Sequence, residues 1–146
     1  MSTAVLAAHD LHAGYHGVPA VRGLEISVQP GEVVALLGPN GAGKTTTIMT
    51  LAGVLPPISG TVALDGKATT EPLFRRARRG LALLTEQRAV AMGLSTLDNL
   101  RLGKGNPERG LELFPELKAR LSTRAGFLSG GEQQMLAIAR ILSTDA

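Results

Sequence analysis

The sequence contains no cysteine and no tryptophan, and it has no long hydrophobic run. The absence of cysteine excludes disulfides and thiolate metal sites. A membrane-spanning helix needs roughly 18–20 consecutive apolar residues, and no segment approaches that length. The first residues, MSTAVLAAHD, also lack the basic region and apolar core of a signal peptide. We therefore expect a soluble protein of the cytoplasm.

Aromatic residues are few, so the core should be mostly aliphatic. The length of 146 residues suits one domain, residues 1–146, with a single core. The net charge is +3, and the basic residues concentrate in RRARR at residues 75–79. This run is short and has no aromatic residues interleaved. A solvated helix face is therefore favoured over a nucleic-acid patch, and we expect no nucleic-acid partner.

Apolar segments bounded by turn signals predict the strands. Residues 4–8 and 18–28 contain β-branched and apolar residues and indicate two or three strands. Residues 60–67, GTVALDGK, indicate a strand followed by a tight Asp-Gly turn. The runs EVVALL at 32–37 and LALL at 81–84 are almost wholly apolar, which is typical of strands buried on both faces of a parallel sheet.

Capping residues and periodicity predict five helices between these strands. The expected helices run from Lys44 to near Gly53, over 71–79, from Ser95 or Thr96, over 107–121, and onward from Ser129. In the last helix, apolar residues recur at helical spacing. The expected buried face consists of Met135, Ile138, Ala139 and Leu142.

A glycine-rich loop lies between the strand expected at 32–37 and the first helix. GPNGAGKT fits the pattern G-x-x-x-x-G-K-[ST] completely. Glycines let successive backbone N–H groups turn around a polyphosphate, and the following helix directs its positive end at the same anion. A chance glycine-rich turn is the alternative, but the strand–loop–helix context argues against it. The residues expected to contact ATP here are Gly38, Pro39, Asn40, Gly41, Ala42, Gly43, Lys44, Thr45 and Thr46.

Within that loop, two residues carry distinct roles. The Lys44 ammonium can reach the β- and γ-phosphates, and the Thr45 hydroxyl can bind Mg²⁺.

A second motif, SGGE, begins at Ser129. Ser129 and Glu132 form the pattern of a capping box, in which serine caps the helix and glutamate reaches back to the cap. A capping box does not explain Gly130 and Gly131, because glycine is a poor helix former. Two glycines at a helix start are useful where a ligand must approach the backbone closely.

With these residues the chain resembles the ATP-binding subunits of ABC transporters. LSGGEQQ is similar to the family signature, and VRGLEISVQPGEVVALLGPNGAGKTTT is similar to the family along its whole length. TEQR, DNL and FPELKAR resemble most closely the branched-chain amino acid importers and their urea or amide relatives. The resemblance covers essentially all 146 residues. It implies a P-loop NTPase of α/β class, with an N-terminal antiparallel β part, a parallel core sheet and a helical signature region.

The resemblance assigns roles to further residues. Tyr15 would stack on adenine, although by itself it would be interpreted as a surface turn residue. Ser129, Gly130, Gly131 and Glu132 would act across a dimer, on ATP held by a second ATP-binding subunit. Membrane permease subunits would be further partners and would hold the protein at the cytoplasmic face of the membrane.

One catalytic position is ambiguous, because Thr85 stands where the family has proline. The residue after that proline contacts Mg²⁺ and the attacking water. Its role falls to Glu86 by register, with Gln87 as the alternative; an acidic residue ending a strand is the plainer interpretation of Glu86.

The family carries further catalytic residues after the signature. These are an aspartate that orders Mg²⁺, a glutamate that polarises water and a switch histidine. The sequence offers only Asp65, which belongs to the expected turn, and Asp145, which has no strand before it. We therefore expect this chain to be the N-terminal portion of a longer protein, inactive by itself, with part of its core missing. We also expect residues 1–146 to be marginally stable and prone to aggregate.

Three functions are compatible with these motifs. The first is ATP hydrolysis that drives solute import, with branched-chain amino acids implied by resemblance only. The second is a short nucleotide-binding module that regulates a full-length ABC subunit without hydrolysing ATP. An unrelated P-loop enzyme such as a kinase would leave LSGGEQQ unexplained.

Overall fold

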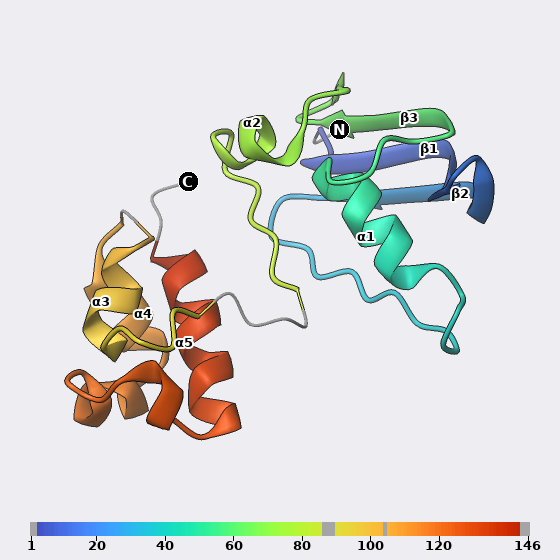
Figure 1. The fold of residues 1–146 in the computed structure, drawn as a ribbon. Coiled ribbons are helices and arrows are strands. Elements are labelled where there is room, and N and C mark those ends of the chain that lie inside the picture. Colours follow the sequence, from blue (N-terminus) through green and yellow to red (C-terminus); the bar gives the residue numbers. More distant parts are fainter. Residues whose placement is uncertain (1–2, 86–89, 104, 144–146) are drawn as a thin grey trace. The chain divides into compact units, whose positions relative to one another are not determined.

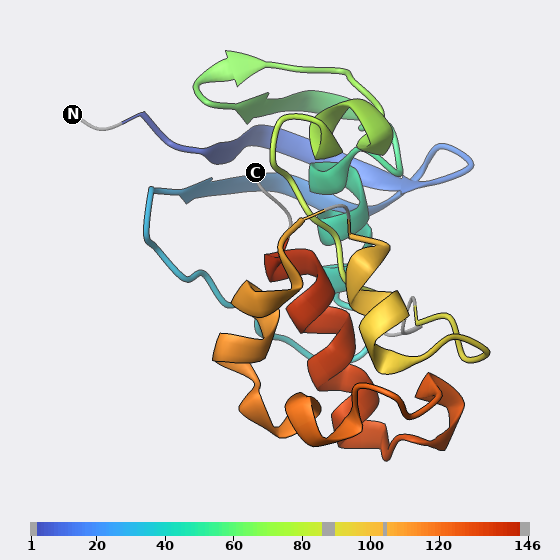
Figure 2. The same cartoon turned by 90° about the vertical axis from the view of Figure 1, so that its left-hand side faces the viewer.

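The computed structural model describes residues 3–85, 90–103 and 105–143. The chain divides into two compact units, Met1–Leu81 and Ala82–Ala146 (Figures 1 and 2). Buried apolar side chains gather into a separate cluster in each unit. Each unit thus buries apolar residues of its own, and the expected single domain over residues 1–146 stays a prediction.

The first unit is built on an antiparallel sheet. Its strands are β1 (Leu6–Tyr15), β2 (Val18–Val28), β3 (Ser59–Leu64) and β4 (Lys67–Ala68), and their order is β2-β1-β3-β4. Tight turns join β1 to β2 and β3 to β4. His16, Gly17, Asp65 and Gly66 all have positive φ, as the favoured two-residue hairpin turns require. The antiparallel β part and the Asp65-Gly66 turn are confirmed.

Helix α1 (Lys44–Ala52) covers one face of this sheet (Figures 1 and 2). Its Leu51 packs with Ala8, Leu11 and Val62 in the buried cluster of the unit. The helix ends at Gly53, whose φ of 81° lets its N–H reach the carbonyls of the last turn. The expected helix after the glycine-rich loop is thus confirmed at both ends.

The basic run lies on and after the short helix α2 (Leu73–Ala77). Arg76 is buried, and its guanidinium donates to the carbonyls of Glu71 and Leu51, each at 2.6 Å. Arg79 forms ion pairs with Asp65 and Glu71. The run is therefore mostly an exposed helix face, as expected, with the exceptions that Arg76 is buried and Arg79 is paired within the unit.

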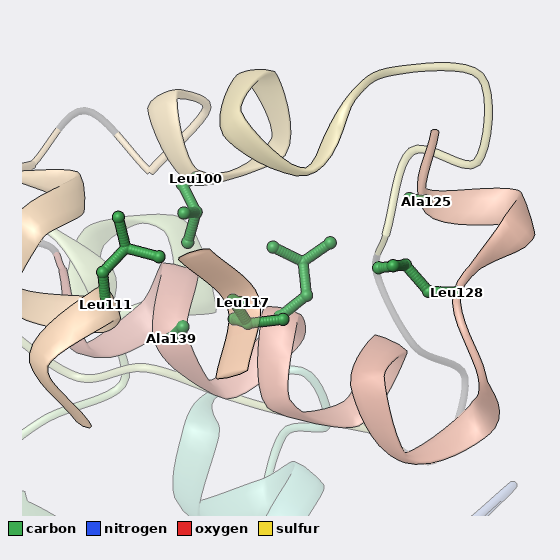
Figure 3. Close-up of a cluster of buried hydrophobic side chains, with 7 residues drawn as sticks. Leu100, Leu111, Leu117, Ala125, Leu128 and Ala139 are labelled. Carbon is green, nitrogen blue, oxygen red and sulfur yellow. The ribbon is translucent and has the colours of Figure 1, made fainter. Parts of the chain in front are cut away.

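The second unit is helical. It contains α3 (Thr96–Arg101), α4 (Pro107–Leu113) and α5 (Gly130–Leu142), with 3₁₀ helices η1 (Pro115–Arg120) and η2 (Ala125–Phe127). The Ser95 hydroxyl caps α3, as expected. The buried cluster consists of Leu100, Leu111, Leu117, Ala125, Leu128, Leu136 and Ala139 (Figure 3).

Two helix predictions in this unit need correction. The segment 107–121 is not one helix, because Pro115 has no N–H to donate and restricts Phe114 to a non-helical conformation. The buried face of α5 agrees only in part with the expected one: Ala139 is buried and Met135 packs against the cluster, as expected, but Leu136 is fully buried and Leu142 is 49% exposed. Residues 135–139 are all apolar, so periodicity alone does not choose the face.

The parallel strands expected at 32–37 and 81–84 are absent from the described residues. Both segments are irregular, and the only sheet within the described ranges is the antiparallel one. Val33 and Leu37 are 95% and 90% exposed. A strand is defined by hydrogen bonds to a neighbour, and no described residue pairs with either segment in a sheet.

Candidate nucleotide-binding site

The glycine-rich loop leads directly into α1. The Ala42 N–H donates to the Pro39 carbonyl at 3.2 Å, which closes a turn. Gly41 and Gly43 both have a φ of 86°, a conformation that L side chains rarely adopt. Gly43 is the N-cap of α1 and provides no side-chain acceptor. The N–H groups of the first turn therefore need an acceptor from outside the helix, and an anion is a suitable one.

Gly43 is further constrained by strand β2. A Cβ at this position would lie 2.7 Å from Val21 Cγ2 and 3.0 Å from the Ala20 carbonyl oxygen. At Gly41 a Cβ would meet no atom within 4 Å. The end of the loop is thus held tightly against β2, while the middle of the loop faces open space.

Lys44 folds back over the loop. Its Nζ donates to the carbonyls of Gly38 and Pro39, at 2.7 and 2.8 Å. An ammonium that spans the loop in this way lies where a polyphosphate in the loop would offer it a charged acceptor. Thr45 is exposed, whereas Thr46 is buried. Of the two threonines, Thr45 has the hydroxyl that is accessible to a metal ion.

Tyr15 lies at the same end of the sheet as the loop. It pairs with Val18 at the β1–β2 turn, two residues before Ala20 on β2. Side chains alternate along a strand, so Tyr15 shares a face with Leu11, which packs with Leu51 of α1. The ring is half exposed. Its position beside the loop, on the helix-covered face, makes it available to stack on a nucleotide base.

The signature residues form the start of α5 in the second unit. Ser129 is the N-cap; its hydroxyl accepts from the Glu132 N–H at 3.2 Å, and the Glu132 carboxylate accepts from the Ser129 N–H at 2.8 Å. The expected capping box is therefore confirmed. A Cβ at Gly131 would meet no atom within 4 Å. The start of this helix is open to an approaching group.

Glu132 has a second partner that neither motif indicates. Arg120 Nε donates to its other carboxylate oxygen at 3.0 Å. The Ser129 N–H, and then the Arg120 guanidinium, lower the pKa of Glu132 below the usual glutamate value. Nearby, the Gln133 amide donates to the carbonyls of Ala125 and Leu128. Only the FPELKAR resemblance pointed to this region, and it gave no role for the arginine.

The structure thus groups the candidate residues in two places. Tyr15 and the glycine-rich loop lie in the first unit, and the signature residues lie in the second. Glu86, Gln87 and Asp145 lie outside the described residues. Asp65 is a turn residue paired with Arg79. Within the described ranges, no cluster of histidine and carboxylate side chains is arranged to hold a metal ion.

Comparison with known proteins gives consistent matches. A family model described as ABC transporter matches residues 21–146. The high-affinity branched-chain amino acid transport ATP-binding protein of Pseudomonas aeruginosa is 39% identical over 91% of this chain and 62% of its own length. The lipopolysaccharide export system ATP-binding protein of Escherichia coli is 34% identical over 97% of this chain and 64% of its own length. This chain therefore spans about three fifths of the length of these curated relatives.

Solved structures agree with the sequence matches. The structure of an ATP-binding cassette of an ABC transporter superposes with a TM-score of 0.80 at 27% identity, covering 98% of this chain and 65% of that one. Among the described residues, no helix combines the length and the apolar character that a membrane span requires.

Proposed function

Because the chain belongs to the ABC transporter family and forms part of its ATP-binding domain, we propose that residues 38–46 hold the phosphates of ATP and that Tyr15 stacks on its adenine. The observation that carries this proposal is the geometry of the loop. Two left-handed glycines, an uncapped helix start and a folded-back Lys44 together form a cradle for a polyanion.

Mg²⁺ fits this cradle through the exposed Thr45 hydroxyl. In the proposed site Glu86 provides a further ligand to Mg²⁺. Gln87 is the alternative residue for the same role. A bound Mg²⁺ would neutralise part of the phosphate charge. Lys44 would exchange its two carbonyl acceptors for phosphate oxygens, which bind an ammonium more strongly because they are charged.

The signature residues act on a second nucleotide in this proposal. Ser129 uses its hydroxyl oxygen as an acceptor within the capping box, and a hydroxyl that accepts can still donate its proton. The open space at Gly131 admits a phosphate to the N–H groups of α5. The second ATP would be held by another ATP-binding subunit, identical or paralogous.

The activity of the whole protein is proposed from the family. The complete protein would hydrolyse ATP at the cytoplasmic face of a membrane and would drive a permease that imports a solute. Branched-chain amino acids are the proposed solute, since a relative at 39% identity carries that description. The relative named for lipopolysaccharide export, at 34% identity, shows that other cargoes occur at similar distance.

Nucleotide binding and phosphate release by purified residues 1–146 test this proposal. ATP binding should be lost in Lys44→Ala and retained in the control Lys67→Ala, which changes an exposed lysine of the same unit. Binding without Mg²⁺-dependent phosphate release is the expected result and does not separate the two candidate functions, whereas release that is abolished in Lys44→Ala would show that residues of this chain catalyse hydrolysis. Equal binding by the Lys44→Ala variant would contradict the proposed site.

A further inference from the structure

The carboxylate of Glu132 joins two elements of the second unit. One oxygen accepts from the Ser129 N–H at 2.8 Å, at the start of α5. The other accepts from Arg120 Nε at 3.0 Å, at the last residue of η1. The two oxygens of one carboxylate are rigidly linked. The guanidinium that holds one oxygen therefore also sets the direction of the other.

The same carboxylate governs the geometry of the signature. The Ser129 hydroxyl accepts from the Glu132 N–H, so both groups of the capping box belong to one closed ring. Glu132 is the third residue of α5, and its backbone and side chain both contact Ser129. A rotation of the Glu132 side chain would therefore release the Ser129 N–H and loosen the hydroxyl that the proposed function places at a phosphate.

We propose that Arg120 is a positioning residue for the signature. By holding Glu132 it fixes the Ser129 hydroxyl and the first N–H groups of α5 in the arrangement that receives the nucleotide of a second subunit. This inference rests on the proposed function. It adds Arg120, which lies outside both motifs, to the residues that prepare the signature for the nucleotide.

Arg120 is not needed to hold the unit together. Its side chain is 53% exposed and that of Glu132 is 22% exposed, and ion pairs that remain open to solvent contribute little to stability. The neighbouring turn is held independently, because the Gln133 amide donates to Ala125 and Leu128 carbonyls. The buried side chains Leu128 and Leu136 also anchor both sides of the signature. Loss of Arg120 should therefore disturb the capping box more than the fold.

The test compares Arg120→Gln with Arg101→Gln in residues 1–146. Arg101 makes an exposed ion pair with Asp98 in the same unit, away from Glu132, and is the matched control. Sedimentation measures the MgATP concentration that half-saturates pairing of two chains. We expect Arg120→Gln to raise this concentration about two- to five-fold, the effect of losing one exposed pair. Arg101→Gln should leave it unchanged.

Four further measurements separate positioning from a structural role. The thermal midpoint and the ATP affinity of the single chain should match wild type in Arg120→Gln. Arg120→Lys, which keeps a cation near the carboxylate, should restore part of the pairing. In a Glu132→Gln background, Arg120→Gln should have no additional effect, since it acts through that carboxylate. Additive effects in the double variant, or equal pairing by Arg120→Gln and Arg101→Gln, would overturn the inference.

A wild-type chain that binds ATP without pairing would contradict the proposed action across a dimer. In that case the exchange rate of the Ser129 amide hydrogen, monitored by NMR, decides the role of Arg120. Faster exchange in Arg120→Gln than in Arg101→Gln would support positioning. Equal exchange in the two variants would overturn it.

Discussion

Gly43 has the strictest steric requirement among the glycines of the phosphate loop. It shares its φ of 86° with Gly41, but only Gly43 lies against β2. Sequence motifs assign both glycines to the loop without distinguishing them. The difference arises because Ala20 and Val21, distant in sequence, fill the space beside Gly43.

Substitution of these two glycines should separate backbone strain from steric clash. Gly41→Ala introduces strain alone, because its Cβ has open space. Gly43→Ala adds a contact of 2.7 Å with Val21, and overpacking of this kind costs about 1–3 kcal/mol. We expect the free energy of unfolding, measured by urea denaturation, to be lower for Gly43→Ala than for Gly41→Ala by that amount. Equal stabilities would show that β2 moves aside freely.

Gly131 differs from Gly43, because the isolated chain has room for a methyl group at this position. Alanine is favoured over glycine inside a helix by about 1 kcal/mol, and a Cβ here meets no atom. We expect Gly131→Ala to leave the thermal midpoint unchanged or raised. The same variant should weaken MgATP-dependent pairing, because the methyl group would occupy the path of the phosphate. Unaltered pairing in sedimentation would count against a close approach at this residue.

At the scale of elements, the start of α5 is sensitive to acid. The Ser129 N–H bond, and secondarily the Arg120 side chain, lower the pKa of Glu132 below its ordinary value of 4.5. The contribution of the ionised carboxylate is therefore complete above about pH 4.5 and is lost as the pH falls through the lower pKa of the folded state.

NMR titration of the Glu132 carboxyl group should show this lowered pKa directly. The protection of the amides at the start of α5, taken relative to their intrinsic exchange rate at each pH, should fall over the same range of acid pH. Arg120→Gln should move the midpoint toward higher pH, since one stabilising partner of the carboxylate is removed. In Glu132→Gln the start of α5 should lose this pH dependence. A Glu132 pKa at or above 4.5 in the wild-type chain would be inconsistent with the bonds seen here.

The helix predictions show which element boundaries are local. Ser95, Ser129 and Gly53 end or begin helices through their own backbone or side-chain bonds, and the sequence located all three. Pro115 also acts locally and divides 107–121 into α4 and η1, whereas the residue pattern predicts one helix there. The buried face of α5 depends on where Leu111 and Leu117 lie, which no local pattern contains.

At the scale of the whole molecule, residues 32–37 stand out because they form an apolar segment that is exposed to solvent. Val33 and Leu37 are almost fully exposed although they immediately precede the phosphate loop. Extended apolar backbone that lacks a strand partner is prone to pair with another chain. If residues 1–146 aggregate as expected, the contact between chains should therefore form at residues 32–37.

A double variant that carries both Val33→Ser and Leu37→Ser should show less self-association of residues 1–146, as measured by light scattering. The thermal midpoint should stay unchanged, because these side chains bury little surface here. Val18→Ser is the matched control, since Val18 is 68% exposed but lies in a paired strand. A wild-type chain that melts cooperatively and sediments as a monomer would contradict the predicted aggregation.

The sequence by itself determined the features that depend on near neighbours along the chain. These are the glycine-rich loop and its helix, the Asp65-Gly66 turn, the capping box and the family. Each follows from backbone conformation or from bonds spanning a few residues. The tertiary structure decided which apolar segments become strands, which face of α5 is buried and how tightly Gly43 is held. It also brought Arg120 to Glu132. Those outcomes depend on partners far away in sequence, which local patterns do not specify.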